Sequence, residues 1–263
     1  MGQSVENRLS ACVICHDEDR NIKRCLESLH EWVHEIVVVD SMSTDRTVEI
    51  AKVFTDRVFQ RPWPGYTAQK NFALSKAGTD WVLSLDADEA VSRALCDEIS
   101  AEIAKPDTLD GYRIPRRSFY QGRWINHSGY YPDRQLRLFR RKKGRWVGGR
   151  VHERMAVEGR IGDFKQDLLH YPYGGKISGQ LRTVNSFSTL LAKDMYDRGK
   201  RFHLGLLFSR PLFKFLEVYV LKRGFKDGLP GLIIAVSDAY AMFVRYVKLR
   251  EINKDYGGQN TWK

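Results

Sequence analysis

Short apolar strands alternate with helical patterns over about the first ninety residues, and this alternation restricts the fold more than any other feature of the chain. Strands are predicted at Leu9–Cys15, Glu35–Asp40, Val58–Gln60 and 81–85, where apolar runs are bounded by polar turns. The segments between them, such as residues 67–77, carry apolar residues at helical spacing. Such an alternation predicts an α/β fold with a Rossmann-like, mostly parallel sheet and helices on both faces.

Carboxylates stand at the ends of two of these strands. Asp40 ends the second strand, and Asp86 and Asp88 follow the strand at 81–85. In open parallel sheets, ligands bind beyond the carboxyl ends of the strands. An Asp-x-Asp pair at the tip of a buried strand can offer oxygen ligands to Mg²⁺ or Mn²⁺ bridging a diphosphate. The sequence therefore predicts a binding site for a divalent cation and a phosphorylated ligand at this edge.

The spacing of Cys12 and Cys15 is that of a redox or zinc-binding pair. Both residues fall in a predicted strand, where residues three apart point to opposite faces. A second Cys-x-x-Cys, which would complete a zinc site, does not occur in the sequence. We therefore expect reduced, buried thiols.

Residues 38–47, Val-Val-Asp-Ser-Met-Ser-Thr-Asp-Arg-Thr, resemble the V-V-D-x-x-S-x-D-x-T signature of family 2 glycosyltransferases with the GT-A fold. Residues 9–20 are similar to the first strand and turn of that family, and residues 69–73 to the helix start before its Asp-x-Asp. The resemblance is specific over residues 8–90. It implies a GT-A nucleotide-sugar-binding fold, a UDP-sugar donor, a divalent cation and inverting transfer.

The resemblance also implies roles for individual residues. Asp40 would accept a hydrogen bond from the nucleobase, Asp86 would contact the ribose or diphosphate, and Asp88 would bind the metal. Lys70, at the helix start, would reach a donor phosphate, and a solvated surface lysine is the alternative. His170, by its position after Glu153, resembles a histidine of related enzymes, which makes it a candidate for a further metal ligand or a diphosphate contact. A structural role is the alternative.

Inverting transfer needs a base that deprotonates the acceptor hydroxyl, while the metal stabilises the departing diphosphate. Glu153 is the first candidate, because smaller family members carry a segment comparable to Val-His-Glu at 151–153 after the Asp-x-Asp. His152 is expected to support the turn. Asp133, in a Tyr-Pro-Asp-Arg-Gln segment, is the runner-up.

The formal net charge of +11 is concentrated between Arg113 and Arg150. A basic surface indicates a polyanionic partner, which is a nucleic acid, an acidic membrane or a phosphorylated substrate. Arg134 and Arg137 are candidate acceptor-binding residues, because guanidinium groups bind phosphate and carboxylate bidentately.

The C-terminal part, residues 177–263, is expected to be a helical extension of a catalytic domain at 1–176. Within that domain, residues 8–90 would bind the donor, and residues 110–176 would supply the base and bind the acceptor. The helical patterns at 204–221 and 231–249 combine a wide apolar face with a narrow polar stripe. This composition favours helices at a membrane interface, and core helices are the alternative.

The N-terminal sequence lacks the features of a signal peptide, and no stretch reaches the ~18 apolar residues of a membrane span. We therefore expect a cytoplasmic protein, peripheral to the cytoplasmic face of the inner membrane.

Residues 219–231 are similar to the tail of bacterial lipopolysaccharide-core glycosyltransferases. This looser resemblance implies transfer of a hexose, glucose from UDP-glucose, to a lipopolysaccharide-core or similar anionic lipid-linked acceptor. One alternative is a polyprenyl-phosphate sugar synthase of the same fold. Another is a non-enzymatic basic protein that binds nucleic acid through interleaved aromatics such as Tyr120 and Trp124. Strand-end carboxylates would repel phosphates without a cation, so we expect no nucleic-acid partner.

Overall fold

A computed structural model describes residues 8–148 and 153–257 and divides the chain into two compact units. The first, which we call the α/β unit, comprises Met1–Ser118 and Pro132–Gly174. The second, the helical unit, comprises Phe119–Tyr131 and Gly175–Lys263. Sequence analysis placed a boundary after residue 176, whereas in the structure residues 119–131 also group with the C-terminal helices.

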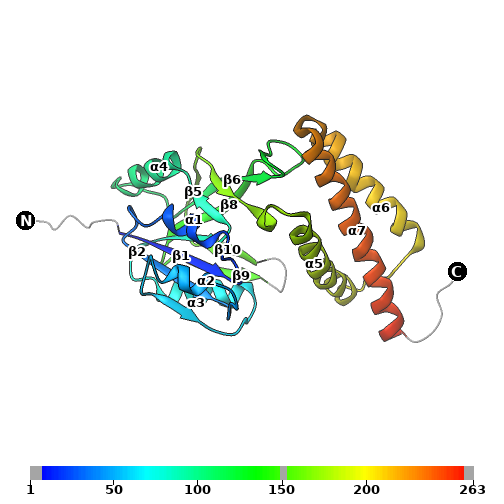
Figure 1. The fold of residues 1–263 in the computed structure, drawn as a ribbon, viewed down its shortest axis with the longest axis horizontal. Helices are drawn as coiled ribbons and strands as arrows, with labels where there is room; N and C mark the ends of the chain where they lie inside the picture. Colours follow the sequence, from blue (N-terminus) through cyan, green and yellow to red (C-terminus); the bar gives the residue numbers. More distant parts are fainter. Residues whose placement is uncertain (1–7, 149–152, 258–263) are drawn as a thin grey trace, which may run out of the picture. The chain divides into compact units, whose positions relative to one another are not determined.

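Four parallel strands make up the N-terminal half of the main sheet, in the order β3-β2-β1-β4 (Figure 1). They correspond to the four predicted strands: β1 (Leu9–Cys15), β2 (Glu35–Asp40), β3 (Val58–Gln60) and β4 (Trp81–Asp86). Because the four strands run in one direction, their carboxyl ends lie at the same edge.

The other half of the main sheet is mixed. Strand β8 (Asp133–Arg140) runs antiparallel to both β4 and β6 (Gly111–Tyr120). Beyond β6 follow β12 (Leu168–His170), parallel to it, and β5 (Glu89–Val91), antiparallel to β12. Two further short strands, β7 (Arg123–Trp124) and β11 (Ile161–Asp163), pair with β6. The expected α/β, GT-A-like fold is confirmed.

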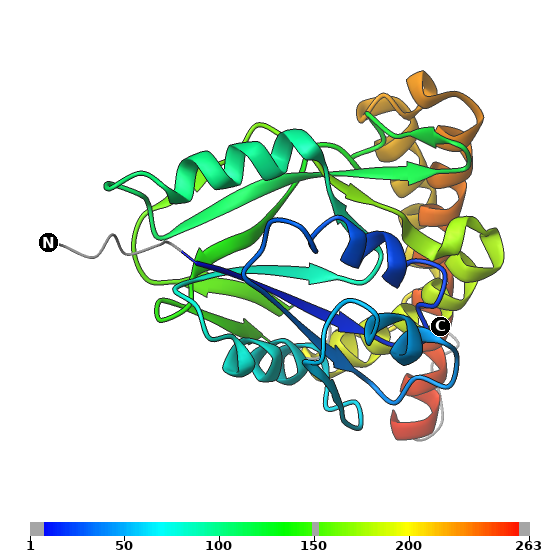
Figure 2. The same ribbon diagram turned by 60° about the vertical axis from the view of Figure 1, so that its left-hand side comes forward.

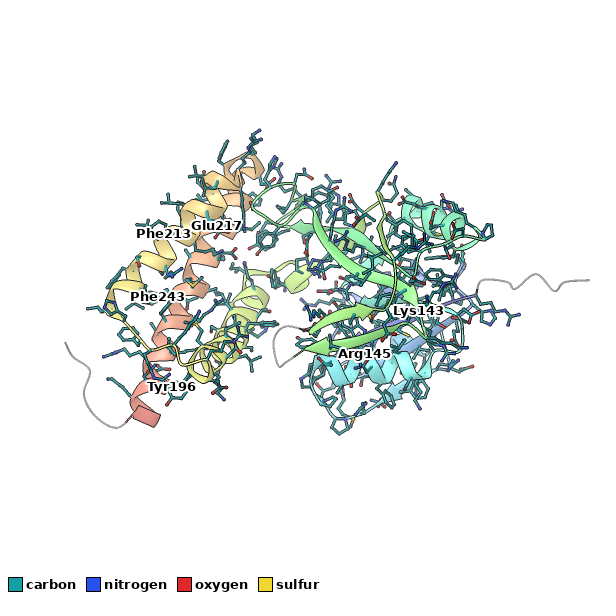
Figure 3. The ribbon with its side chains drawn as sticks, turned by 180° about the vertical axis from the view of Figure 1, so that it is seen from behind. Lys143, Arg145, Tyr196, Phe213, Glu217 and Phe243 are labelled. Carbon is teal, nitrogen blue, oxygen red and sulfur yellow. The ribbon has the colours of Figure 1, made fainter. Side chains whose placement is uncertain are left out.

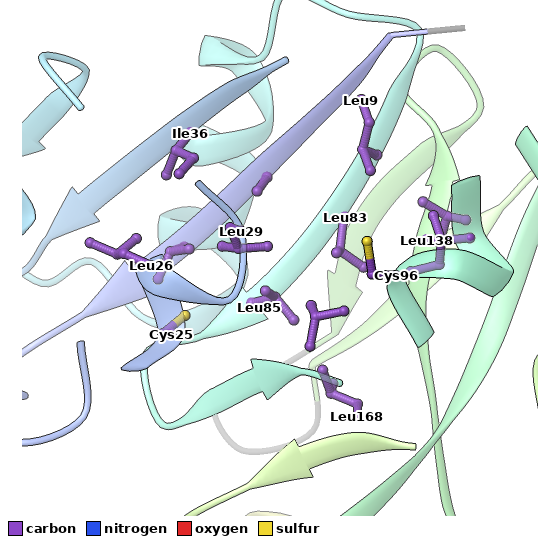
Figure 4. Packing of buried hydrophobic residues seen from close by; sticks show 14 of the residues in the cluster. Leu9, Cys25, Leu26, Leu29, Ile36, Leu83, Leu85, Cys96, Leu138 and Leu168 are labelled. Carbon is purple, nitrogen blue, oxygen red and sulfur yellow. The ribbon is translucent and has the colours of Figure 1, made fainter. Parts of the chain in front are cut away.

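Both faces of the sheet are covered, as Figures 1 and 2 show. One core contains residues of α1 (Ile22–Glu27), α2 (Thr47–Ala51) and α4 (Arg93–Ile103), and Figure 4 shows part of it. The other contains residues of α3 (Tyr66–Lys76) and of the antiparallel pair β9 (Gly144–Gly148) and β10 (Glu153–Val157).

Alternate residues of β1 enter opposite cores, as the strand period of two requires. Cys15 belongs to the core with α1, and Cys12 to the core with α3. All four cysteines are buried and free, which confirms the expectation of buried thiols.

Three long helices dominate the helical unit: α5 (Ile177–Asp197), α6 (Leu204–Leu216) and α7 (Gly228–Gly257). Helix α7 packs against both α5 and α6. Short helical turns lie at Pro172–Gly175, before α5, and at Glu217–Leu221 and Gly224–Asp227, between α6 and α7. Within residues 8–148 and 153–257, no helix combines the length and apolar character needed to cross a membrane.

The turn before α7 depends on a glycine and a buried carboxylate. A Cβ atom on Gly231 would lie 1.9 Å from the carbonyl oxygen of Gly224, so this close approach of two backbones requires glycine. Asp227 accepts hydrogen bonds from the backbone N–H groups of Asn126 (3.2 Å) and His127 (3.0 Å). These bonds hold the 119–131 segment to the helices within the helical unit.

Candidate active site

Asp40 lies at the carboxyl end of β2, where sequence analysis expected it, and its side chain is fully buried. Its carboxylate accepts hydrogen bonds from the backbone N–H of Ser43 (2.9 Å), from the Ser43 hydroxyl, and from Nε2 of Gln60 (3.2 Å). The polar turn after β2 and the end of β3 therefore fix this carboxylate. Its contact with a nucleobase stays a prediction.

Lys70 joins the end of β4 to the start of β10. Its Nζ lies 3.1 Å from Oδ1 of Asp86, 3.4 Å from Oε1 of Glu153, and 4.4 Å from the ring centroid of Trp146. With 4 % of its side chain exposed, Lys70 is a buried lysine rather than a solvated surface one. A contact between Lys70 and a donor phosphate stays a prediction.

Arg137 reaches the same carboxylate from β8. Its Nη2 lies 2.7 Å from Oδ2 of Asp86 and 2.6 Å from Oε1 of Glu89, and the residue is 3 % exposed. Burial by itself would lower the pKa of Arg137, but these two carboxylates raise it. Arg137 was predicted to bind the acceptor, whereas its direct partners in the structure are the carboxylates of Asp86 and Glu89.

These contacts belong to a longer series of ion pairs. Arg116 of β6 extends it, with Nη1 3.1 Å from Oε1 of Glu89 and Nη2 2.5 Å from Oδ2 of Asp133. Seven side chains of alternating sign follow one another, and we call them the charge chain: Asp133, Arg116, Glu89, Arg137, Asp86, Lys70 and Glu153. The two base candidates, Asp133 and Glu153, are its ends.

The charge chain fixes the ionisation of Asp86. Burial would raise the pKa of this carboxyl, but the positive charges of Arg137 and Lys70 hold it well below its ordinary value. Asp86 is therefore an anion at neutral pH, with one oxygen on each cation.

Asp88 and His170 lie together beside this chain. Nε2 of His170 is 3.4 Å from Oδ2 of Asp88, and Nδ1 is 2.9 Å from the Ser118 hydroxyl. In the described part of the chain, no three histidine, cysteine or acidic side chains gather into a metal-binding group. Mg²⁺ and Mn²⁺ do not need such a group when substrate phosphates and waters complete the coordination. The oxygen and imidazole donors of Asp88 and His170 therefore fit a cation that binds with a diphosphate.

Two acidic residues at this edge, Glu18 and Glu89, were not among the site residues predicted from the sequence. Glu18 follows β1, and burial raises its pKa to about 7, with the charges of Asp88, Asp45 and Asp86 adding to the effect. Glu89 is 1 % exposed and binds both Arg116 and Arg137. Their positions in the sequence could have indicated them, because Glu18 occupies the turn after a parallel strand and Glu89 directly follows the Asp-x-Asp.

A cavity of about 430 Å³ adjoins the charge chain. This volume is within the range of small-molecule sites. It is lined by Lys70, Asp86, Arg113, Arg116, Arg134, Gln135, Leu136, Arg137, Trp146, Glu153, Arg154 and Met155. Lys70, Asp86, Glu153, Arg134 and Arg137 were all site candidates from the sequence, and the structure brings them to one cavity. Asp40, Asp88 and His170 are not among its lining residues, and His152 lies outside the described residues.

Residues 10–158 match the family model of glycosyl transferase family 2. The chain is 35 % identical to the lipopolysaccharide core biosynthesis glycosyltransferase LpsC of Rhizobium meliloti (strain 1021) over 249 residues, which cover 92 % of this chain and 91 % of the relative. It is 33 % identical to an uncharacterized glycosyltransferase of Rickettsia typhi over 257 residues, which cover 94 % and 88 % of the two chains.

Two solved structures are more distant. Residues 1–349 of TarS from S. aureus give a TM-score of 0.47 at 16 % identity, with 97 % of this chain and 93 % of that chain covered. Glucosyl-3-phosphoglycerate synthase from Mycobacterium tuberculosis, in complex with Mg²⁺ and UDP, gives 0.36 at 22 % identity, with 44 % and 45 % covered.

Proposed function

The chain belongs to glycosyl transferase family 2, and within this family we propose that it transfers a hexose, glucose from UDP-glucose, with inversion to a lipopolysaccharide-core or similar lipid-linked glycan. One observation carries the proposal: a single buried cation, Lys70, contacts both the strand-end carboxylate Asp86 and the base candidate Glu153. The proposed donor and acceptor chemistries thus meet beside one cavity. The name of the Rhizobium relative supports the class of acceptor.

Donor binding is assigned to the carboxyl edge of the parallel strands. Asp40 would accept a hydrogen bond from uracil, Asp86 would contact the ribose or diphosphate, and Lys70 would neutralise a phosphate. A divalent cation held by Asp88 and His170 would supply charge stabilisation for the leaving diphosphate. The short distance between Asp88 and His170 supports that pairing.

Glu153 is the proposed base. It would take the proton of the acceptor hydroxyl as that oxygen attacks the anomeric carbon. Asp133 is less suited to this step, because it accepts hydrogen bonds from Nε (2.9 Å) and Nη2 (2.5 Å) of Arg116 and from Gln135 (2.7 Å). The carboxylate of Glu153 meets a longer contact of 3.4 Å from Lys70 and also lines the cavity.

The helical unit is proposed to make peripheral contact with an anionic membrane at the cytoplasmic face. Exposed apolar residues recur every three or four positions along α6 and α7, which places them in a stripe on each helix. These stripes are Leu204, Phe208, Leu212 and Leu216 on α6, and Leu229, Leu232, Val236, Tyr240 and Phe243 on α7. Figure 3 labels Phe243 of α7 and Phe213 of α6, an exposed residue that follows Leu212 in the sequence. The exposed cations Lys222, Arg223 and Lys226 lie in the turns between the two helices, as anionic headgroups would favour.

A transfer assay with two acceptors tests the proposal. UDP-glucose and Mn²⁺ are supplied with either a truncated lipopolysaccharide core or a polyprenyl phosphate, and products are weighed by mass spectrometry. We expect one added hexose on the core glycan. Transfer to polyprenyl phosphate alone would support the other acceptor class, and an absence of transfer from every nucleotide sugar tried would contradict both. Membership of an enzyme family already favours either over nucleic-acid binding.

A further inference from the structure

One part of the cavity is lined by five members of the charge chain: Arg116, Arg137, Asp86, Lys70 and Glu153. In the charge chain three cations alternate with four carboxylates, of which Asp86 and Glu153 line the cavity. Every cation in this series contacts two carboxylates, and with three cations to four carboxylates the series as a whole carries no excess positive charge. We call this part of the cavity the floor.

Positive charge is in excess where Arg113 and Arg134 line the cavity. We call this region the rim. Nε and Nη2 of Arg113 each lie 2.9 Å from an oxygen of Asp163. Nη1 of Arg134 lies 3.5 Å from the same carboxylate and 3.2 Å from the carbonyl oxygen of Phe164. Two guanidinium groups therefore share one carboxylate, and both side chains are nearly half exposed.

The pairing of β6 with β8 supports this placement. Arg113 stands opposite Leu136 in the register, and a Cβ on Gly111 would touch both Leu136 and Val157 of β10. Gly111, Arg113 and Leu136 thus share the face of the sheet that β10 covers.

An apolar wall completes the cavity. Leu136, Trp146 and Met155 line it together with the charged residues of the floor and rim. An aromatic and aliphatic wall suits the C–H groups of a sugar ring. The cavity therefore combines a carboxylate base candidate, a surface for a ring, and a rim with excess positive charge.

We propose that the acceptor carries a phosphate or carboxylate group on or beside the sugar that is glycosylated, and that Arg134 and Arg113 at the rim bind this anion. The inference rests on the proposed function, since it takes Glu153 as the group that meets the acceptor hydroxyl. Guanidinium binding of an anion is directional and charge-assisted, so it fixes the orientation of the acceptor as well as its affinity. Arg137, whose charge is neutralised by Asp86 and Glu89, has no part in this recognition.

Three probes built on the same kind of sugar ring test this inference by isothermal titration: glucose 6-phosphate, glucuronate and glucose. The full-length protein is first titrated with UDP and Mn²⁺, and each probe is then added to the UDP-saturated protein. We expect one or both anionic sugars to bind at least about tenfold more tightly than glucose, the size of a charge-assisted hydrogen bond. The stronger of the two identifies the anionic group as phosphate or carboxylate.

Variants distinguish anion binding at the rim from nonspecific attraction to the basic surface. Arg134→Gln should weaken binding of the anionic probe about tenfold or more. Arg145→Gln is the matched control, because Arg145 is an exposed arginine of β9 outside the cavity lining (Figure 3). Asp163→Asn removes the carboxylate that the two arginines share, so anion binding should strengthen by about two- to fivefold. A damaged fold could not produce that gain.

Several results would overturn the inference: equal binding of glucose and both anions, no binding of any probe, an unchanged Arg134→Gln, or an equal loss in Arg145→Gln. Failure of UDP to bind would instead contradict the proposed function. The two failures are therefore distinguishable within one set of titrations.

Discussion

The two units of the chain treat apolar and charged side chains in opposite ways. The α/β unit encloses its apolar residues on both faces of the sheet and draws charged groups such as Arg137 and Glu89 into its interior. The helical unit leaves large apolar residues such as Phe208 and Leu212 on the surface of its helices. In the described part of the chain, most exposed large apolar side chains belong to the helical unit.

Both arrangements cost the folded state free energy, each for a different physical reason. Buried ion pairs add little net stability, because desolvation offsets most of the attraction between the charges. Groups held in this way are common where chemistry is done. Exposed apolar stripes also cost free energy in water, and large exposed apolar patches are typical of surfaces that bind a protein, a membrane or a ligand. In the proposed function, the α/β unit carries the reaction and the helical unit attaches to the membrane.

The largest effect is expected inside the α/β unit, at the base candidate. Glu153→Gln should lower the rate of hexose transfer by about 10²–10⁴-fold, because the general base is lost while the side chain keeps its size. Steady-state kinetics and UDP titration measure the loss of turnover separately from donor binding. Asp133→Asn is the comparison, and a larger loss of turnover in that variant would identify Asp133 as the base.

The next largest effect concerns the free energy of unfolding, and it compares a buried arginine of the α/β unit with an exposed one. Arg137→Ala leaves Asp86 and Glu89 without their shared partner and should lower the free energy of unfolding by about 3–5 kcal/mol. Arg113→Ala removes an exposed pair and should cost about 1 kcal/mol or less. Urea denaturation measures both. Equal costs for the two variants would show that the charge chain is not held as an interior network.

In the helical unit, loss of exposed apolar side chains should weaken binding to lipid vesicles. Replacing Phe208 and Leu212 together by serine removes apolar contact area and should weaken co-sedimentation with anionic vesicles about tenfold or more. The unfolding transition should change little, because both side chains are exposed. Val53→Ser, at an exposed apolar residue of the α/β unit, is the control. If all variants sediment like the parent protein, the stripes have another function.

The smallest effect concerns the pH dependence of stability. Since burial raises the pKa of Glu18 to about 7, its ionisation costs the folded state free energy as the pH rises from about 4.5 through 7. Glu18→Gln removes that cost. The substitution should therefore raise the free energy of unfolding at pH 8 by about 1 kcal/mol or more beyond its effect at pH 5. Thermal unfolding in EDTA at the two pH values checks this, with exposed Glu27→Gln as the control. An equal effect at both pH values would argue against a raised pKa.

Local patterns in the sequence were sufficient to predict the carboxyl edge of the parallel strands. The strands β1 to β4 and the positions of Asp40, Asp86 and Asp88 at their ends follow from apolar runs, helical spacing and the parallel arrangement that the alternation predicts. Each of these inferences needs only residues that are near one another in the sequence.

The partners of Arg137 could not be found in this way. They depend on the antiparallel register of β4 with β8, which pairs Leu83 with Leu138. That register joins residues far apart in sequence, and no local pattern specifies it. The assignment of residues 119–131 to the helical unit has the same origin, because it depends on hydrogen bonds to Asp227 about a hundred residues away.

We propose that the strand-end carboxylates form a metal-dependent donor site, and titration of UDP into the purified protein tests this proposal. UDP is added in Mn²⁺ and in EDTA, to the parent protein and to Asp88→Ala. We expect micromolar binding in Mn²⁺ that is lost both in EDTA and in the variant. Binding that is unaffected by EDTA and by Asp88→Ala, or no binding under any condition, would contradict it.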